Sequence, residues 1–163
     1  MFVLRRLDCL LEPTKQAVLE EVRFQREEAG FNELDNSGLT EASGYLFYNT
    51  SNFTLKSLLG NPSQLEANFK TYLDSFSQNV KEIISNFDLY NQARKMAQAD
   101  VLHDVIEKFV AENINLSSEP KKVADGRILP ALTNLGMGYV FEELIRKFNE
   151  ENNEEAGEHF TPR

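Results

Sequence analysis

The sequence predicts an all-α fold, a single bundle-like domain of several helices joined by long loops. Three observations lead to this prediction. Apolar side chains recur every three or four residues over most of the chain, as they do along the buried face of a helix. Capping residues, prolines and glycines separate these stretches from one another. The chain also lacks the alternation of strand-like and helical segments that would indicate a parallel sheet.

The first helical stretch runs from Phe2 to Glu28, and its apolar stripe consists of Leu4, Leu7, Leu11, Val18 and Val22. Pro13 lacks the N–H that a helix interior uses, so it is predicted to kink this stretch or to begin a new helix. Gly30 is expected to end it. The turn-forming residues from Asn32 to Gly38 then predict a loop.

The centre of the chain gives the strongest helical pattern. Asn61-Pro62 combines a capping residue with a first-turn proline, and an apolar face follows at i, i+4, i+7, i+8 and i+11: Leu65, Phe69, Tyr72, Leu73 and Phe76. Before it, Ser51 or Asn52 is expected to cap a short helix that ends at Gly60. After it, Val80, Ile83, Ile84 and Phe87 form a further stripe.

One long helix is predicted from about residue 91 to residue 113. Pro120, Gly126 and Pro130 then break the periodicity, so a loop with no more than one helical turn is expected between 114 and 133. The last helix begins at Thr133 or Asn134. Its expected buried face consists of Met137, Val140, Phe141, Leu144, Ile145 and Phe148.

The composition is that of an ordinary globular protein, with 41% hydrophobic and 26% charged residues among 163. A formal net charge of −9 argues against a protein that coats nucleic acid by itself. No apolar run approaches the roughly 20 residues of a membrane-spanning helix. A lone cysteine, Cys9, excludes an internal disulfide and is typical of a reducing compartment, so we expect a cytoplasmic protein without a membrane partner.

Candidate catalytic groups are scarce. His103 is followed by Asp104 and Glu107, but the helical zinc motif needs a second histidine, so a structural or surface role is expected. Gly136 and Gly138 resemble the start of a dinucleotide-binding loop, yet no strand precedes them. The residues alone therefore predict an interaction module without a catalytic or metal site.

Four segments resemble a known family. The stretch from Met137 to Phe148, which contains Phe-Glu-Glu-Leu-Ile-Arg, and the Gly-Glu-His-Phe-Thr-Pro-Arg that ends at residue 163 resemble the entry into the catalytic domain of type I restriction–modification methyltransferase (modification) subunits. Tyr48 to Leu55 and Tyr72 to Val80 also resemble segments of that family. The resemblance is good from about residue 45 onward and loose over the first forty residues.

The resemblance implies a helical N-terminal domain over residues 1–153 and the start of a catalytic domain over residues 154–163. The whole subunit would transfer a methyl group from S-adenosylmethionine to adenine in DNA. Its partners would be a specificity subunit, a restriction subunit, a second modification subunit and double-stranded DNA. By the same resemblance, one edge of the cofactor site would consist of Glu158, His159, Phe160, Thr161, Pro162 and Arg163. The rest of that site is not in this sequence, so the chain alone is expected to be inactive.

Two functions remain open for the helical region. One is to assist DNA clamping and subunit assembly without catalysing a reaction, and the other is to assemble subunits without touching DNA. Lys121, Lys122 and Arg127 form the densest group of basic residues, in a region predicted to be a loop. We therefore expect DNA phosphate contacts, if this domain makes them, to come from these three residues.

Overall fold

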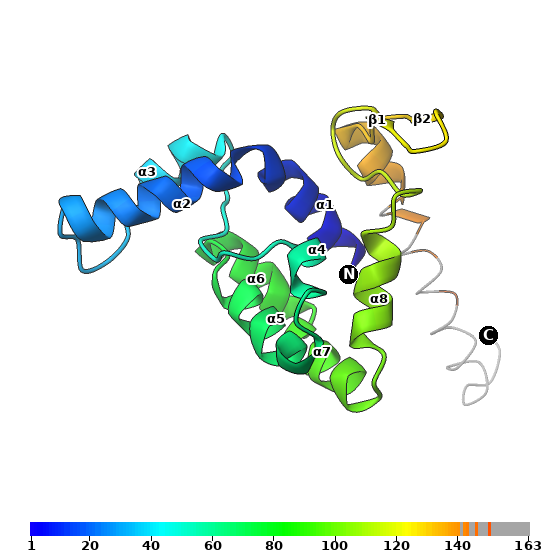
Figure 1. The fold of residues 1–163 in the computed structure, drawn as a ribbon, viewed down its shortest axis with the longest axis horizontal. Helices are drawn as coiled ribbons and strands as arrows, with labels where there is room; N and C mark the ends of the chain where they lie inside the picture. Colours follow the sequence, from blue (N-terminus) through cyan, green and yellow to red (C-terminus); the bar gives the residue numbers. More distant parts are fainter. Residues whose placement is uncertain (141, 144–145, 147–149, 151–163) are drawn as a thin grey trace, which may run out of the picture. The chain divides into compact units, whose positions relative to one another are not determined.

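The computed structural model describes residues 1–140, 142–143, 146 and 150. The chain divides into two compact units, Met1–Ile114 and Asn115–Arg163. The described residues are mostly helical, which confirms the all-α prediction (Figure 1). No helix among them is long and apolar enough to cross a membrane.

The first unit begins with α1 (Phe2–Leu11), a 3₁₀ turn (Glu12–Thr14) and α2 (Lys15–Arg23). Pro13 lies inside the 3₁₀ turn, so the predicted interruption is confirmed. A five-residue π-helix (Phe24–Glu28) extends α2, and Gly30 follows with φ 68°, a conformation that glycine adopts without strain.

The predicted loop from Asn32 to Gly38 is only partly correct, because α3 (Asn36–Ser43) begins inside it. The Asp35 side chain caps this helix by accepting a hydrogen bond from the Gly38 N–H. Gln25, which is buried, holds Asp35 in place, since its Oε1 accepts from the Asp35 N–H at 2.6 Å. This long-range contact fixes the start of the helix and is invisible to a local sequence pattern. Helices α2 and α3 lie side by side (Figure 1).

The short helix α4 (Leu55–Leu58) is capped by Thr54. The sequence predicted Ser51 or Asn52 as the cap, and that prediction is wrong. Thr54 and Ser57 form a reciprocal capping box, in which each side chain accepts the other residue's backbone N–H. A 3₁₀ turn (Pro62–Gln64) then leads into α5 (Leu65–Asp74), so the restart predicted at Asn61-Pro62 is confirmed.

Helix α6 (Gln78–Asn86) follows, but the single long helix predicted over residues 91–113 is wrong. The structure has α7 (Leu89–Gln98) and α8 (Leu102–Phe109) instead. The break occurs at Asp100, whose φ of 59° is left-handed and incompatible with a continuous helix. Aspartate is one of the few residues that adopt this conformation readily, so the residue type permits the break without signalling it strongly.

The main hydrophobic core lies among α1, α4, α5, α6, α7 and α8. All five residues of the central apolar pattern are buried, which confirms that α5 is the centre of this core: Leu65, Phe69, Tyr72, Leu73 and Phe76. Tyr72 packs edge-on against Phe76, with ring centroids 5.0 Å apart. A second, smaller cluster of Val18, Val22 and Leu39 holds α2 against α3.

The second unit contains a β-hairpin, so the prediction of a loop between residues 114 and 133 is wrong. Strand β1 (Lys121–Lys122) pairs antiparallel with β2 (Ile128–Leu129), drawn in yellow in Figure 1. Residues 134–140 are helical, and the Thr133 Oγ1 accepts the Gly136 N–H at 2.9 Å, as expected for a cap. Phe141 and Phe148, expected in the buried face of this helix, lie outside the described residues, as do residues 154–163.

Candidate nucleic-acid interface

A buried ion pair links α1 to the centre of the first unit. The Arg5 Nη1 donates to the Asp8 Oδ2 at 2.7 Å, and both residues are almost fully buried. The other carboxylate oxygen, Oδ1, accepts from the Leu55 N–H and from the Tyr72 hydroxyl, each at 3.2 Å. Asp8 therefore ties three helices together through one carboxylate.

Burial shifts the acid–base behaviour of this cluster. Desolvation raises the pKa of Asp8, and the nearby Arg5 guanidinium opposes the shift without cancelling it. Burial and the neighbouring Asp8 carboxylate hold the pKa of Tyr72 well above its ordinary value. Burial also lowers the pKa of Lys15 to about 8, although Asp8 acts in the opposite direction.

A second buried polar group, Asn49, connects two segments far apart in the chain. Its Nδ2 donates to the Tyr72 carbonyl at 2.8 Å, and its Oδ1 accepts from Ser51 and from the Lys15 Nζ. Backbone hydrogen bonds from Thr50 to Ser75 and from Ser77 to Tyr48 complete an isolated β-bridge around it. The two segments whose sequences resemble the family, Tyr48 to Leu55 and Tyr72 to Val80, therefore bind each other.

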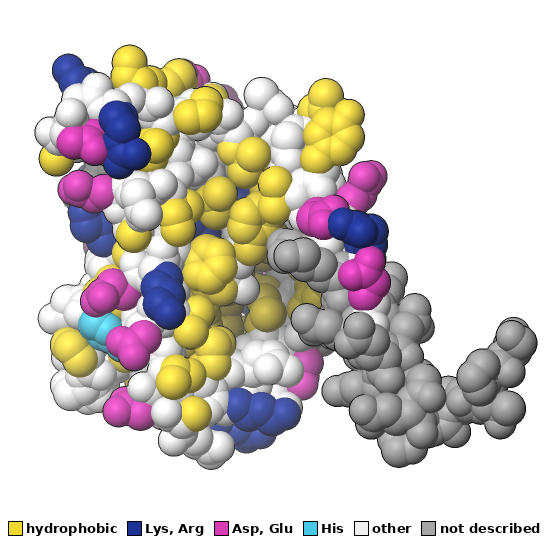
Figure 2. Space-filling view, turned by 90° about the vertical axis from the view of Figure 1, so that its right-hand side faces the viewer, with side chains coloured by type: hydrophobic (Ala, Val, Ile, Leu, Met, Phe, Trp, Pro, Cys, Tyr) yellow, Lys and Arg dark blue, Asp and Glu magenta, His cyan; other side chains and the backbone are white. Residues whose placement is uncertain are grey.

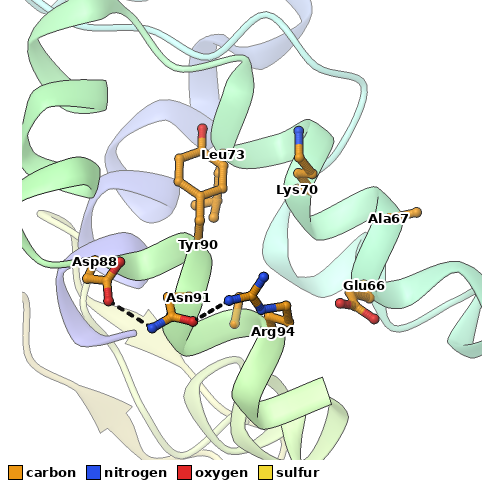
Figure 3. A pocket seen from close by; sticks show the side chains of 9 residues that line it. Glu66, Ala67, Lys70, Leu73, Asp88, Tyr90, Asn91 and Arg94 are labelled. Atoms are coloured by element: carbon orange, nitrogen blue, oxygen red, sulfur yellow. Dashed lines mark hydrogen bonds between the residues drawn. The ribbon is translucent and has the colours of Figure 1, made fainter. Parts of the chain in front are cut away.

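A groove of about 500 Å³ lies between α5 and α7 (Figure 3). Its apolar floor includes Leu73, and its rim carries Lys70 and Arg94 as well as two carboxylates, Glu66 and Asp88. Figure 3 shows the hydrogen-bond chain from Asp88 through Asn91 to Arg94. The groove therefore has charges of both signs.

The cations of this groove already have partners. Lys70 forms an ion pair with Asp74 at 2.9 Å. The same carboxylate accepts a short hydrogen bond of 2.5 Å from the Tyr90 hydroxyl, and burial together with this bond raises the pKa of Tyr90 to about 12. Since Asp74 holds Lys70 and two carboxylates share the rim, the groove is poorly suited to bind DNA phosphates.

His103 has no metal-binding surroundings in the described part of the chain. Its Nδ1 lies 3.9 Å from Asp104 and 3.7 Å from Glu107, on the exposed side of α8, and Figure 2 shows the histidine beside acidic side chains. No group of three or more potential metal ligands occurs among the described residues. The surface role expected for His103 agrees with this position.

The hairpin places the three predicted DNA-contacting residues on two faces. Lys121 pairs with Leu129 and Lys122 with Ile128, so the two lysines point to opposite faces of the hairpin. Lys122 is exposed, whereas Lys121 is half-buried on the face that contains the buried Val123. The three residues are therefore close in the sequence, but the hairpin does not bring their charges together on one surface.

Arg127 is partly neutralised within the same turn. Its Nε donates to the Asp125 Oδ2 at 2.6 Å, and its backbone N–H donates to the other oxygen of that carboxylate. Gly126 has φ 90°, which allows the turn to bring the two residues together. Lys122 and Arg127 are thus both exposed, but Arg127 has an ionic competitor for phosphate in Asp125.

The family described as the HsdM N-terminal domain matches residues 1–109. The chain belongs to this family. It carries the N-terminal domain of the M subunit of a type I restriction–modification system. No curated protein and no solved structure matches the chain.

The matched range differs from the range inferred from the resemblance. The HsdM N-terminal domain extends over α1 to α8, including the first forty residues, whose resemblance was loose. The match does not include the C-terminal segments of the resemblance, which begin at Met137. The segments around Asn49 and Phe76 do lie inside it, and their mutual binding gives a structural reason for their sequence pattern.

The predicted cofactor residues, from Glu158 to Arg163, lie outside the described residues. Sequence reasoning missed the roles of two buried polar residues of the HsdM N-terminal domain, Asp8 and Asn49. A signal for Asp8 was present, because Arg5 and Asp8 are opposite charges three residues apart on a helix. Asn49 gave no comparable signal, since the partners through which it links distant segments, Tyr72 and Lys15, lie 23 and 34 residues away.

Proposed function

We propose that this chain is a non-catalytic module that assists a type I modification subunit in clamping DNA and assembling its complex. The subunit would transfer methyl groups from S-adenosylmethionine to adenine, in the cytoplasm, together with a specificity subunit, a restriction subunit and a second modification subunit. The observation that carries the proposal is the family match over residues 1–109.

DNA contact is assigned to Lys121, Lys122 and Arg127. These residues lie on a short hairpin, and two of them are exposed. Lysine and arginine neutralise backbone phosphates without reading sequence, which suits a clamp whose target is recognised by another subunit. The contact is therefore expected to be independent of the DNA sequence.

Replacing all three residues by alanine in the assembled complex tests this assignment. Each neutralised phosphate contributes about −0.9 to the slope of log affinity against log salt concentration. We expect the slope to flatten by about 2, mostly through the two lysines, because Asp125 competes for Arg127. Affinity should fall equally for specific and nonspecific duplexes, as measured by fluorescence anisotropy over a salt series.

A matched control replaces Lys95 and Lys108, two exposed lysines of α7 and α8, by alanine. An unchanged slope in the triple variant removes the hairpin from the DNA interface. That result favours the second candidate function, a domain that assembles subunits without touching DNA. The net charge of −9 is the observation that favours this second candidate.

The cofactor assignment leads to a separate prediction. We propose that Glu158 to Arg163 contribute one edge of the S-adenosylmethionine site, whose remaining motifs are not in this sequence. One open edge cannot enclose a small molecule. The 163-residue chain should therefore show no detectable heat of binding for S-adenosylmethionine in calorimetry and no methyl incorporation into DNA. Binding at micromolar concentration would contradict the assignment.

A further inference from the structure

Lys15, the first residue of α2, is a half-buried lysine whose hydrogen-bond acceptor is neutral. Its Nζ donates to the Asn49 Oδ1, an amide oxygen, at 3.2 Å. It forms no ion pair with any described residue. Burial penalises the charged form of an amine, and a negative charge in contact with it would offset that penalty. The surroundings of Lys15 therefore favour the neutral amine.

Little negative charge balances this amine. Segment 45–51, which supplies the acceptor of Lys15, contains no charged side chain. Asp8, on α1, is the carboxylate whose charge acts on Lys15, but it already pairs with Arg5 and accepts two further hydrogen bonds. The effect of burial consequently exceeds the attraction of Asp8 and lowers the pKa of Lys15 to about 8.

We propose that Lys15 is a site of acylation, where the neutral Nζ takes up the acyl group of an acyl phosphate. A neutral amine is the nucleophilic form of lysine, and desolvation is one of the ways in which proteins activate it. The Nζ lone pair attacks the acyl carbon, a C–N bond forms, and the C–O bond to phosphate breaks. Phosphate leaves with the bonding electron pair, and the nitrogen releases one proton to water. This site requires neither DNA nor a second subunit, so it is independent of the proposed clamping function.

The product of this reaction is compatible with the fold. An acylated Nζ keeps one N–H, so it still has a proton to donate to the Asn49 Oδ1. The other hydrogen bonds of Asn49, with Ser51 and with the Tyr72 carbonyl, do not involve Lys15. Acylation therefore removes one positive charge and preserves the link between α2 and segment 45–51.

The direct test treats the complete 163-residue chain with acetyl phosphate and measures acetylation at each lysine by mass spectrometry. At a pH of about 7.5, an amine with a pKa of about 8 has a neutral fraction roughly two orders of magnitude above that of an ordinary lysine. Lower basicity and partial burial offset part of this gain, so Lys15 should react about tenfold faster than the exposed Lys95 and Lys108. Equal or slower reaction at Lys15 would overturn the proposal.

Two controls without any substitution accompany this measurement. In urea, where the chain is unfolded, Lys15 should lose its advantage over Lys95, and an advantage that persists there would overturn the proposal. Acetyl-CoA, a thioester with a bulky leaving group, should acetylate the half-buried Lys15 more slowly than acetyl phosphate at equal concentration. Faster reaction with the thioester would overturn the assignment of an acyl phosphate as the donor.

The variant Asn49→Asp tests the role of the neutral acceptor. It places a carboxylate in contact with the Lys15 Nζ, which favours the ammonium form and should lower the acetylation rate at Lys15 to that at Lys95. A thermal melt establishes that the variant is folded. An unchanged rate at Lys15 in the folded variant would overturn the proposal. If the variant does not fold, the comparison of the unmodified chain with and without urea decides the question.

Discussion

Replacing Asp8 by alanine is expected to lower the free energy of unfolding by about 3–5 kcal/mol, the usual cost of leaving one partner of a buried ion pair alone. The change removes the acceptor of three donors at once: the Arg5 Nη1, the Leu55 N–H and the Tyr72 hydroxyl. Arg5 would then be a buried cation without any counter-charge. Since whole domains are stable by about 5–15 kcal/mol, the loss would be visible in urea unfolding followed by circular dichroism.

The double variant Arg5→Met with Asp8→Leu is the informative control. Replacing both partners with apolar residues removes the cost of burying the two charges together with the attraction between them. The stability of the double variant should therefore lie far closer to that of the unmodified chain. The Leu55 N–H and the Tyr72 hydroxyl still lose their acceptor, which keeps a residual cost of about 1–3 kcal/mol. A double variant less stable than Asp8→Ala alone would contradict this account of the pair.

Truncating Phe76 to alanine should cost about 3–5 kcal/mol, as expected for a fully buried aromatic side chain. Phe76 is 2% exposed, packs edge-on against Tyr72 and takes part in the bridge with Asn49. Its removal leaves a cavity at the centre of the main core, where surrounding side chains already fill the space. Thermal and urea melts of the variant measure the loss.

Phe87→Ala provides a matched comparison, because this phenylalanine is 54% exposed at the end of α6. Its replacement should change the stability by no more than about 0.5 kcal/mol, as for other surface substitutions. Similar losses for the two variants would mean that the core is not centred on α5. Because both variants replace a phenylalanine with alanine, the difference between their losses of stability measures the effect of burial.

The sequence by itself determined that the chain is mostly helical and which face of its central helix is buried. The spacing of Leu65, Phe69, Tyr72, Leu73 and Phe76 predicted α5 and its buried side chains correctly, because burial of an apolar stripe dominates the energetics of a short amphipathic helix. Pro13 and Asn61-Pro62 marked boundaries correctly, since proline acts on the local backbone. The DNA-contact assignment at the hairpin and the cofactor assignment remain predictions.

Only the tertiary structure decided which polar side chains hold the helices together. Asp8 and Asn49 are polar residues at ordinary positions in the sequence, and each gains its role from partners at distant positions in the chain. The hairpin around Lys121 and Lys122, and the division between α7 and α8 at Asp100, also escaped the sequence patterns. Apolar periodicity records burial along one segment, whereas a buried hydrogen bond depends on two segments meeting. A buried hydrogen bond between distant segments can therefore be identified only in the folded structure.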